Sequence, residues 1–301
     1  MQQSAIPAAS TKLENGVKMI YDINGNPISS AYDMSGNLLN SAYNKDGNKI
    51  YQREIKVMTY NVGGWYIGSG RNVPSAKKQE YYELQTGMIT DNDPDVLVIQ
   101  EYLAQFSDDG TSALTMLQNL FPYVHTKTSG TYFGRAVCSK YPITDYTERQ
   151  FTQESSRYFD SCTITIGGLP ITFVDTHLGL TQANRDPEIV QLISFLSMQN
   201  MFVCCGDFNT DIGTSSANTT STEYIDNVKP FIDEGFNSAN FSDFGFKATY
   251  VDENDIPLYI DNIYTSSGID ITGVYVDTTK ETDDIAEKID HMPLVATLVI
   301  Q

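Results

Sequence analysis

The chain has 301 residues, of which 41% are hydrophobic and 11% aromatic, a composition that excludes a disordered chain. The net charge of −19 argues against tight nonspecific binding to nucleic acid, but it leaves a nuclease open because a bound divalent cation inverts the field locally. No apolar run approaches the ~20 residues of a membrane span, and the start, MQQSAIPAAS, has neither the basic residues nor the apolar core of an intact signal peptide. We therefore expect no transmembrane segment, and the compartment stays open between secretion after signal removal and the cytoplasm.

Residues 1–52 are predicted to form a separate segment of short strands and turns, because an internal repeat covers most of them. Its units begin at Tyr21, Tyr32 and Tyr43 and read YDINGNPISSA, YDMSGNLLNSA and YNKDGNKIYQR. Each unit has a Gly-Asn pair where a tight turn needs positive φ, at Gly25, Gly36 and Gly47. Three such units bury little surface, so we expect the segment to be a spacer or to contact a partner or the rest of the chain.

Residues 53–301 alternate predicted strands with predicted helices and form one domain, because no linker rich in Pro or Gly divides them. The strands are apolar or alternating runs at 55–61, 95–101, 136–142, 162–166, 171–177, 202–209, 260–266 and 294–300. Helical patterns cover 75–93, 112–121 and 186–200, the last with Pro187 in its first turn, and residues 214–234 change from polar to helical. This order predicts an α/β (α+β) fold of two packed sheets with helices outside.

Polar side chains mark the ends of the predicted strands. Four apolar runs end at a polar residue, at Asn61, Glu101, His177 and the pair Asp207 and Asn209. Two later runs begin just after polar pairs, Asp261–Asn262 and Asp290–His291. Strands that leave a site by one end, together with antiparallel strands that enter it, would gather all of these residues at one edge.

The gathered residues have the composition of a metal-dependent phosphoryl-transfer site. Carboxylates packed at one rim repel each other strongly at low dielectric, and a hard divalent cation relieves that repulsion. Oxygen ligands without cysteine suit Mg²⁺, with Mn²⁺ or Ca²⁺ as alternatives, rather than zinc. An aspartate can orient or deprotonate an attacking water, and a histidine held by a carboxylate can stabilise the transition state or donate a proton.

Taken singly, these residues are weaker indicators. A lone aspartate at a strand end is more often a turn former or a helix cap, and a lone histidine is more often a core residue. His125 fits no pattern and is predicted to lie on the surface or in a loop. Cysteines occur without the spacing of a zinc site and are predicted to be core residues with no required disulfide, at Cys138, Cys162, Cys204 and Cys205.

In their order along the chain, the motifs resemble those of the endonuclease/exonuclease/phosphatase superfamily. This superfamily includes DNase-type nucleases, abasic-site endonucleases, neutral sphingomyelinases and inositol polyphosphate 5-phosphatases. The resemblance spans roughly residues 54–301 and rests on MTYNVGGW, DVLVIQEY, GRAVCSKYPI, FVDTHL, CGDFNT, YIDNIYTS and DHMPLVATL. It implies a four-layer α/β/β/α sandwich of two mixed β-sheets, with the small β-rich repeat segment outside it.

The resemblance also implies roles for residues of the site. Glu101 would bind the metal, with Asn61 nearby and Asp290 as a second or water-mediated ligand. Asp207 would position the attacking water, and Asn209 would hold the phosphate or the water.

The remaining residues would contact the phosphate. His291, oriented by Asp261, would approach it from one side and His177 from the other. Arg157, in SSRYFDS, falls where some members carry a phosphate-binding arginine.

The sequence departs from the family pattern at two positions. Ile289 stands where a serine is usual, and the groove arginine that DNase-type members carry after the metal-binding glutamate is not evident after Glu101. The second departure weighs against a protein that binds the groove of duplex DNA.

These features predict a Mg²⁺-dependent phosphodiesterase that hydrolyses a phosphate ester by in-line attack of an activated water. Nucleic acid, a phospholipid headgroup and inositol phosphate all fit as substrate. A nuclease or general phosphodiesterase is preferred because no apolar hairpin for membrane insertion stands out, with a sphingomyelinase-like enzyme or an inositol-phosphate phosphatase as alternatives. A non-catalytic binding or adhesion module is the rival hypothesis, but carboxylates at one rim cost stability when no metal is bound.

Overall fold

Two stacked sheets covered by helices make up most of the described structure. The computed structural model describes residues 54–65, 78–103, 113–129, 132–152, 157–210, 224–240, 248–251, 257–279 and 291–301, with residue 222 and the strand segments 10–14, 17–21, 31–32, 38–39, 41–43, 49–52, 67–68 and 71–72. Within these residues, no helix has the length and apolar character needed to cross a membrane.

The first sheet has six strands in the order β11-β12-β10-β7-β22-β21. Its members are β7 (Glu54–Asn61), β10 (Val96–Tyr102), β11 (Tyr123–Ser129), β12 (Tyr132–Ser139), β21 (Ile269–Val276) and β22 (Leu294–Ile300). β7 and β10 run parallel, whereas β22 pairs antiparallel with β7. The carboxyl ends of β7 and β10 therefore meet the amino end of β22 at one edge.

The second sheet has six strands in the order β13-β14-β15-β16-β20-β17. Its members are β13 (Ile143–Gln150), β14 (Tyr158–Ile166), β15 (Leu169–His177), β16 (Phe202–Asp207), β17 (Asn237–Ser238) and β20 (Asp261–Thr265). β15 and β16 run parallel, and β20 is antiparallel to β16. Here too, two strands end where a third begins.

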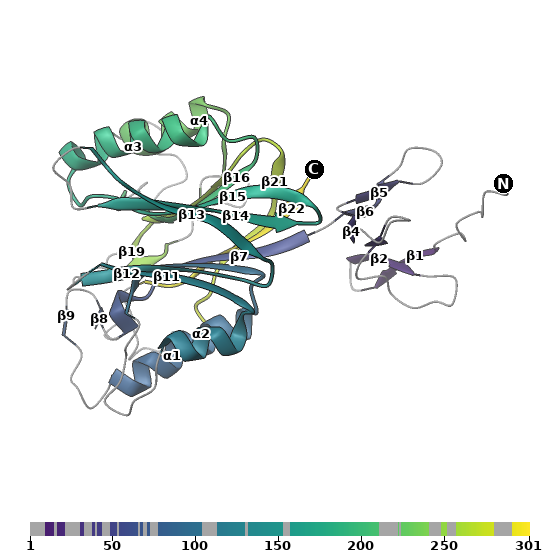
Figure 1. The fold of residues 1–301 in the computed structure, drawn as a ribbon, viewed down its shortest axis with the longest axis horizontal. Helices are drawn as coiled ribbons and strands as arrows, with labels where there is room; N and C mark the ends of the chain where they lie inside the picture. The colour runs from purple at the N-terminus through teal and green to yellow at the C-terminus, as the bar shows by residue number, and fades with distance from the viewer. Residues whose placement is uncertain are drawn as a thin grey trace.

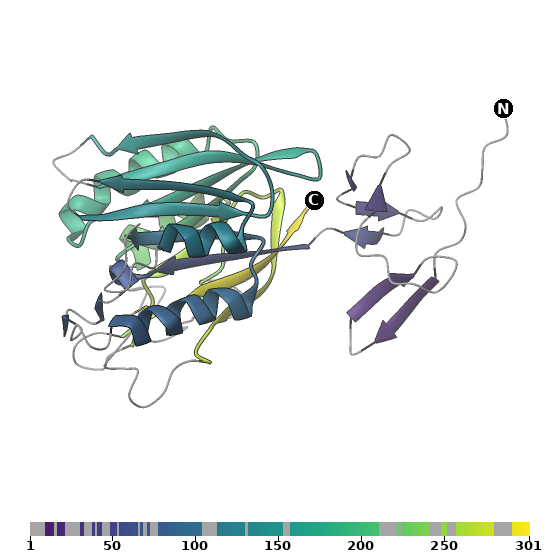
Figure 2. The same ribbon diagram turned by 60° about the horizontal axis from the view of Figure 1, so that its bottom comes forward.

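Helices cover the outer face of each sheet, which gives the four-layer α/β/β/α sandwich predicted from the sequence (Figure 1). α1 (Lys78–Asn92) and α2 (Ala113–Leu120) lie on the first sheet and run side by side in Figure 2. α3 (Gln182–Leu196), the π-helix η3 (Tyr224–Val228) and α4 (Lys229–Asp233) lie on the second. Apolar side chains such as Val57, Val98, Ile164 and Phe173 fill the space between the sheets, and each contributes about 1.5–3 kcal/mol by burial.

The N-terminal segment forms short antiparallel pairs among its described residues. These are β1 (Ser10–Glu14) with β2 (Val17–Tyr21), β3 (Ala31–Tyr32) with β4 (Leu38–Leu39), and β5 (Ser41–Tyr43) with β6 (Lys49–Gln52). The predicted turn glycines lie outside the described residues. Other short elements are η1 (Gly63–Trp65), the pair β8 (Ile67–Gly68) and β9 (Arg71–Asn72), and the pair β18 (Tyr250–Val251) and β19 (Pro257–Leu258).

The helix predicted over 186–200 was placed wrongly by four residues, because α3 begins at Gln182 and Pro187 lies in its second turn. Contacts with the preceding loop fix the true start. The Thr181 carbonyl accepts from the N–H of Arg185 at 3.0 Å, and the buried Glu188 carboxylate accepts from the N–H of Gly179 at 2.7 Å. These bonds outweigh the preference of proline for a first turn.

Four strands of the two large sheets were not predicted from the sequence, and each is an edge strand: β11, β13, β17 and β21. Their side chains are exposed or half-buried at many positions, as in β13 and β21, so the apolar pattern that marks a buried strand is weak. In the segment 214–234, helical structure is described from Tyr224 onward, and residues 211–221 lie outside the described part of the chain.

Candidate active site

One row of side chains crosses three neighbouring strands of the second sheet at its site edge. β15 ends at His177, β16 ends at Asp207, and β20 begins at Asp261. His177 is the register partner of Asp207, and Asp207 is the register partner of Asp261. Register partners on adjacent strands lie close enough for their side chains to interact, so strand pairing alone brings one histidine and two carboxylates together.

The first sheet contributes three more predicted residues to the same edge. β7 ends at Asn61, Glu101 lies near the end of β10, and His291 comes just before β22. The pairing of β10 with β12 shifts register after Ile99, and Glu101 has a φ of 54°. This bulge turns Glu101 toward the site, where its Oε1 accepts a hydrogen bond of 3.3 Å from the Asn61 amide.

Asp207 is the centre of the arrangement. Its Oδ2 accepts a hydrogen bond of 3.1 Å from Asn61 Nδ2 and lies 3.4 Å from His177 Nε2 and 3.7 Å from His291 Nε2. The side chain is 2% exposed. Nitrogen atoms from both sheets therefore surround one buried carboxylate oxygen.

Asn209 is held beside Asp207 by two hydrogen bonds. Its backbone N–H donates to Asp207 Oδ1 at 2.8 Å, and its side-chain amide donates to the carbonyl of Leu178 at 2.8 Å. Asn209 adopts a φ of 49°, a left-handed conformation that asparagine tolerates better than most residues. β16 ends at Asp207 rather than at Asn209, so the predicted strand was two residues too long.

His291 and Asp261 form a directly bonded pair. His291 Nδ1 lies 2.9 Å from Asp261 Oδ2, and both side chains are buried. Because Nδ1 is bonded to Asp261, the other ring nitrogen, Nε2, is the one that faces Asp207. Two residues that the sequence analysis missed support the pair: Tyr250 packs edge-on against the His291 ring with centroids 4.8 Å apart, and the Thr249 hydroxyl accepts from the N–H of Asp261 at 3.1 Å. They carry no charge and form no recognisable motif, which is why the sequence did not indicate them.

The environment of His177 favours a neutral imidazole. The pKa of His177 is lowered to about 3, mainly by burial and in smaller part by the charge of Arg157, against the opposing effect of Asp207. His177 Nδ1 lies 3.9 Å from Glu101 Oε1, so it has a carboxylate on each side. The ring can donate or accept a hydrogen bond at neutral pH, but it adds no positive charge.

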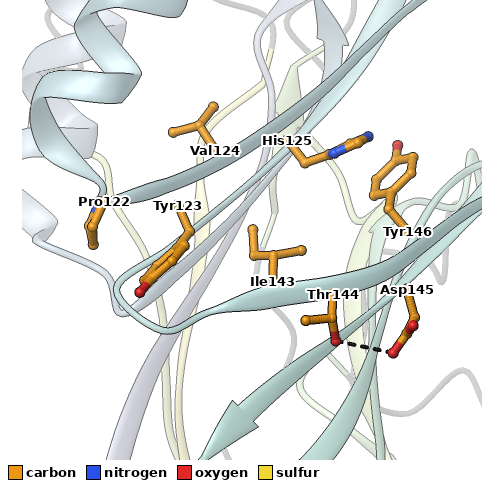
Figure 3. Close-up of a pocket in the computed structure, with 8 residues that line it drawn as sticks. All are labelled: Pro122, Tyr123, Val124, His125, Ile143, Thr144, Asp145 and Tyr146. Carbon is orange, nitrogen blue, oxygen red and sulfur yellow. Dashed lines mark hydrogen bonds between the residues drawn. The ribbon is translucent and has the colours of Figure 1, made fainter.

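Three other predicted positions have different outcomes. Arg157 precedes β14, is half-buried, and acts electrostatically on His177. Asp290 lies outside the described residues. His125, which was predicted to lie on the surface or in a loop, is half-buried on the edge strand β11 and stacks on Tyr146 with ring centroids 3.5 Å apart, where both line a cleft of about 400 Å³ (Figure 3). The cysteines are free thiols buried in the cores.

The sequence model of the Endonuclease/Exonuclease/phosphatase family matches residues 58–283, which is more than half of the 301 residues. The chain belongs to this family. The match covers Asp207 and six other predicted site residues: Asn61, Glu101, Arg157, His177, Asn209 and Asp261. Membership implies a phosphoester substrate. A comparison with curated proteins gave no significant match.

Solved structures of family proteins share the fold at low sequence identity. Truncated TDP2 from Caenorhabditis elegans is similar with a TM-score of 0.61 and 17% identity, over 82% of this chain and 97% of that one. The endonuclease/exonuclease/phosphatase protein from Beutenbergia cavernae gives a TM-score of 0.63 and 16% identity, over 83% and 72%. The 3′ phosphatase NExo from Neisseria, bound to a product DNA hairpin, gives 0.59 and 17%, over 80% and 98%. At these identities the likeness establishes the fold alone.

The family's dependence on a metal fits the donor atoms at this edge. Asp207, Asp261 and His291 can each place one ligand atom within 4.8 Å of the others. The Oδ1 atom of Asp261 is buried and has no hydrogen-bond partner among the described residues. A buried carboxylate oxygen without a donor is costly, and a cation would satisfy it. The expected ligand Glu101 is 20% exposed at its side chain and also faces this space.

Proposed function

We propose that this protein is a metal-dependent phosphodiesterase that hydrolyses its substrate by in-line attack of water. The observation that carries the proposal is the environment of Asp207 Oδ2, which is approached by Asn61 Nδ2, His177 Nε2 and His291 Nε2 at 3.1, 3.4 and 3.7 Å. A carboxylate fixed in this way can orient a water molecule and accept its proton. Nothing in this arrangement requires a covalent enzyme intermediate.

Asn209 and the two histidines would bind the phosphate around that water. Asn209 is oriented by its bonds to Asp207 and Leu178, so its amide can hold a phosphate oxygen or the water. Asp261 would stabilise a positive charge on His291, and His291 would then donate a charged hydrogen bond to the developing phosphorane. The neutral His177 would donate from the opposite side.

We infer that Glu101 holds a Mg²⁺ ion, with Asn61 nearby and Asp290 as a second or water-mediated ligand; Mn²⁺ or Ca²⁺ would also suit these oxygen ligands. The bound ion would supply charge neutralisation at the phosphate and at the leaving oxygen. The alternative ligand set of Asp207, Asp261 and His291 would satisfy Asp261 Oδ1, because the 2.9 Å bond between Asp261 and His291 uses Oδ2 and Nδ1 and leaves Oδ1 and Nε2 for an ion. We prefer Glu101 for Mg²⁺ because the alternative set includes an imidazole nitrogen, and Mg²⁺ prefers oxygen ligands.

A phosphodiester of nucleic acid is the substrate to test first. One structurally similar protein is a 3′ phosphatase bound to a DNA hairpin. The net charge of −19 favours a short or single-stranded substrate held mainly at the metal site over a long duplex held by a basic groove. Sphingomyelin and an inositol polyphosphate represent the other two substrate classes.

The test compares bis(p-nitrophenyl) phosphate, plasmid DNA, a single-stranded oligonucleotide, sphingomyelin and an inositol polyphosphate, each with Mg²⁺ and with EDTA. We expect turnover that requires the metal and falls by at least two orders of magnitude in Asp207→Asn and Glu101→Gln. His125→Gln is the matched control, because His125 lies on the edge strand β11 and is not one of the residues around Asp207. Turnover that survives EDTA, or that is unchanged in Glu101→Gln, would contradict the proposal.

A further inference from the structure

A buried hydrogen bond joins the two sheets directly beneath the candidate active site. Gln100 on β10 donates from Nε2 to Oδ1 of Asp175 on β15, at 2.7 Å. The two side chains are 0% and 1% exposed. Because β10 belongs to the first sheet and β15 to the second, this contact fixes the position of one sheet relative to the other.

Further polar side chains support the bond from both sheets. On the first sheet, the Thr59 hydroxyl donates to Gln100 Oε1 at 3.3 Å. On the second sheet, Asp160 is the register partner of Asp175, and its Oδ2 forms an ion pair of 2.8 Å with Nε of Arg135, which reaches across from β12. Polar contacts thus connect strands of both sheets through a region otherwise filled by apolar side chains.

The charge in this region is lowest when Asp175 carries a proton. Burial, reinforced by the neighbouring Asp160 carboxylate, raises the pKa of Asp175 well above its usual range. Oδ2 of Asp175 and Oδ1 of Asp160 are both buried without a hydrogen-bond partner among the described residues, and the two side chains are directly opposite each other. Gln100 therefore needs only an oxygen acceptor from a protonated Asp175, and the side-chain amide of an asparagine would supply the same acceptor.

Each partner of this bond lies close to a residue of the site along its own strand. Gln100 immediately precedes Glu101, and the bulge that turns Glu101 toward the site leaves Gln100 pointing between the sheets. Asp175 precedes His177 by two residues, so both side chains lie on the same face of β15. Glu101 and His177 are themselves 3.9 Å apart across the gap between the sheets.

We infer that Gln100 and Asp175 are positioning residues of the active site: their bond sets the separation of Glu101 and His177, and so holds the two halves of the site in register. The inference rests on the proposed function for its effect on turnover. Supporting residues behind metal ligands and catalytic groups typically change metal affinity or activity by 10- to 100-fold when removed. We expect a loss of that size in kcat and in the apparent affinity for Mg²⁺, with little change in KM at saturating Mg²⁺.

Four single variants and one double variant separate positioning from general stability. Gln100→Met and Asp175→Leu break the bond with little change in volume, and the double variant should be no worse than either alone. Asp175→Asn keeps the oxygen that accepts the bond from Gln100. Its activity should stay within about three-fold of wild type, because the change in the free energy of this bond should be smaller than the ~1.4 kcal/mol that corresponds to a factor of ten. Thr265→Val is the control, because it removes a buried hydrogen bond of 2.7 Å to the Ile269 carbonyl at the far end of β20.

Ring signals of His177 in NMR spectra provide a readout that does not need activity. The chain has only three histidines, so substitution of His125 and His291 assigns them. The His177 signals should shift in Gln100→Met and Asp175→Leu, and stay near the wild-type position in Asp175→Asn and Thr265→Val. Unshifted His177 signals in the first two variants, or a loss in Asp175→Asn equal to that in Asp175→Leu, would overturn the inference. A wild-type protein without metal-dependent turnover would instead overturn the proposed function, while the NMR comparison still tests the bond.

Discussion

Replacement of Asp261 by asparagine tests the histidine that we place against the phosphate. Asp261 Oδ2 lies 2.9 Å from His291 Nδ1, and both side chains are nearly fully buried. A hydrogen bond to a charged group contributes about 1.5–3 kcal/mol, so its loss should lower kcat by about 10- to 150-fold. Asp261→Asn keeps the shape of the side chain and leaves the bond from the Asp261 N–H to Thr249 in place, so folding should be little affected.

The assay is metal-dependent turnover of the best substrate for Asp261→Asn, His291→Ala and the double variant. If Asp261 acts through His291, the double variant should be no slower than His291→Ala, because the two residues work as a unit. Thermal unfolding and circular dichroism should match the wild type. A loss in kcat below three-fold, or additive losses in the double variant, would refute the idea that Asp261 orients and charges His291.

Three further outcomes follow from the geometry. Gly206 has a φ of 156°, and a Cβ there would lie 2.0 Å from the carbonyl oxygen of Thr176, so Gly206→Ala should destabilise the protein by about 3 kcal/mol or more in urea unfolding. Because burial lowers the pKa of His177 from 6.5 to about 3, the unfolded chain binds a proton that the folded protein excludes. The free energy of unfolding should therefore be greatest above pH 6.5 and decline as the pH falls toward 3, and His177→Gln should flatten that decline. Saturating Mg²⁺ at 100 times its Kd should stabilise the wild type by about 2.7 kcal/mol, with a raised Tm that EDTA reverses and Glu101→Gln abolishes.

The central strands, and the shared edge at which their polar end residues lie, could be predicted because both depend on local pattern. Strands buried on both faces are continuous apolar runs, and a polar residue at the end of such a run is conspicuous, as at Glu101, His177 and Asp207. Strand direction then decides that these ends share one edge. The edge strands β11, β13 and β21 were missed because partial exposure weakens the same pattern, and β17 was missed because it has only two residues.

Contacts between the sheets could not be predicted, because they depend on how two separately formed surfaces pack. Gln100 and Asp175 each stand within an apolar run, and nothing in either run indicates that they meet at 2.7 Å. The bulge at Glu101 is hidden for the same reason, since a positive φ at a glutamate is imposed by the surroundings and not by the residue. The start of α3 depends on Arg185 and Glu188 contacting the loop before it, which outweighed the local preference of Pro187.

The charges around Asp207 explain why a divalent cation is central to the proposed reaction. Glu101, Asp207 and Asp261 bring three carboxylates to one edge, while His177 is held neutral and His291 is already paired with Asp261. A phosphate anion placed about 4 Å from one unpaired carboxylate would be repelled by about 4 kcal/mol at an effective dielectric constant of 20. Arg157 offsets part of this repulsion through its position near His177. In the proposed mechanism a cation at Glu101 would offset the rest, so loss of the metal should weaken substrate binding as well as slow the chemical step.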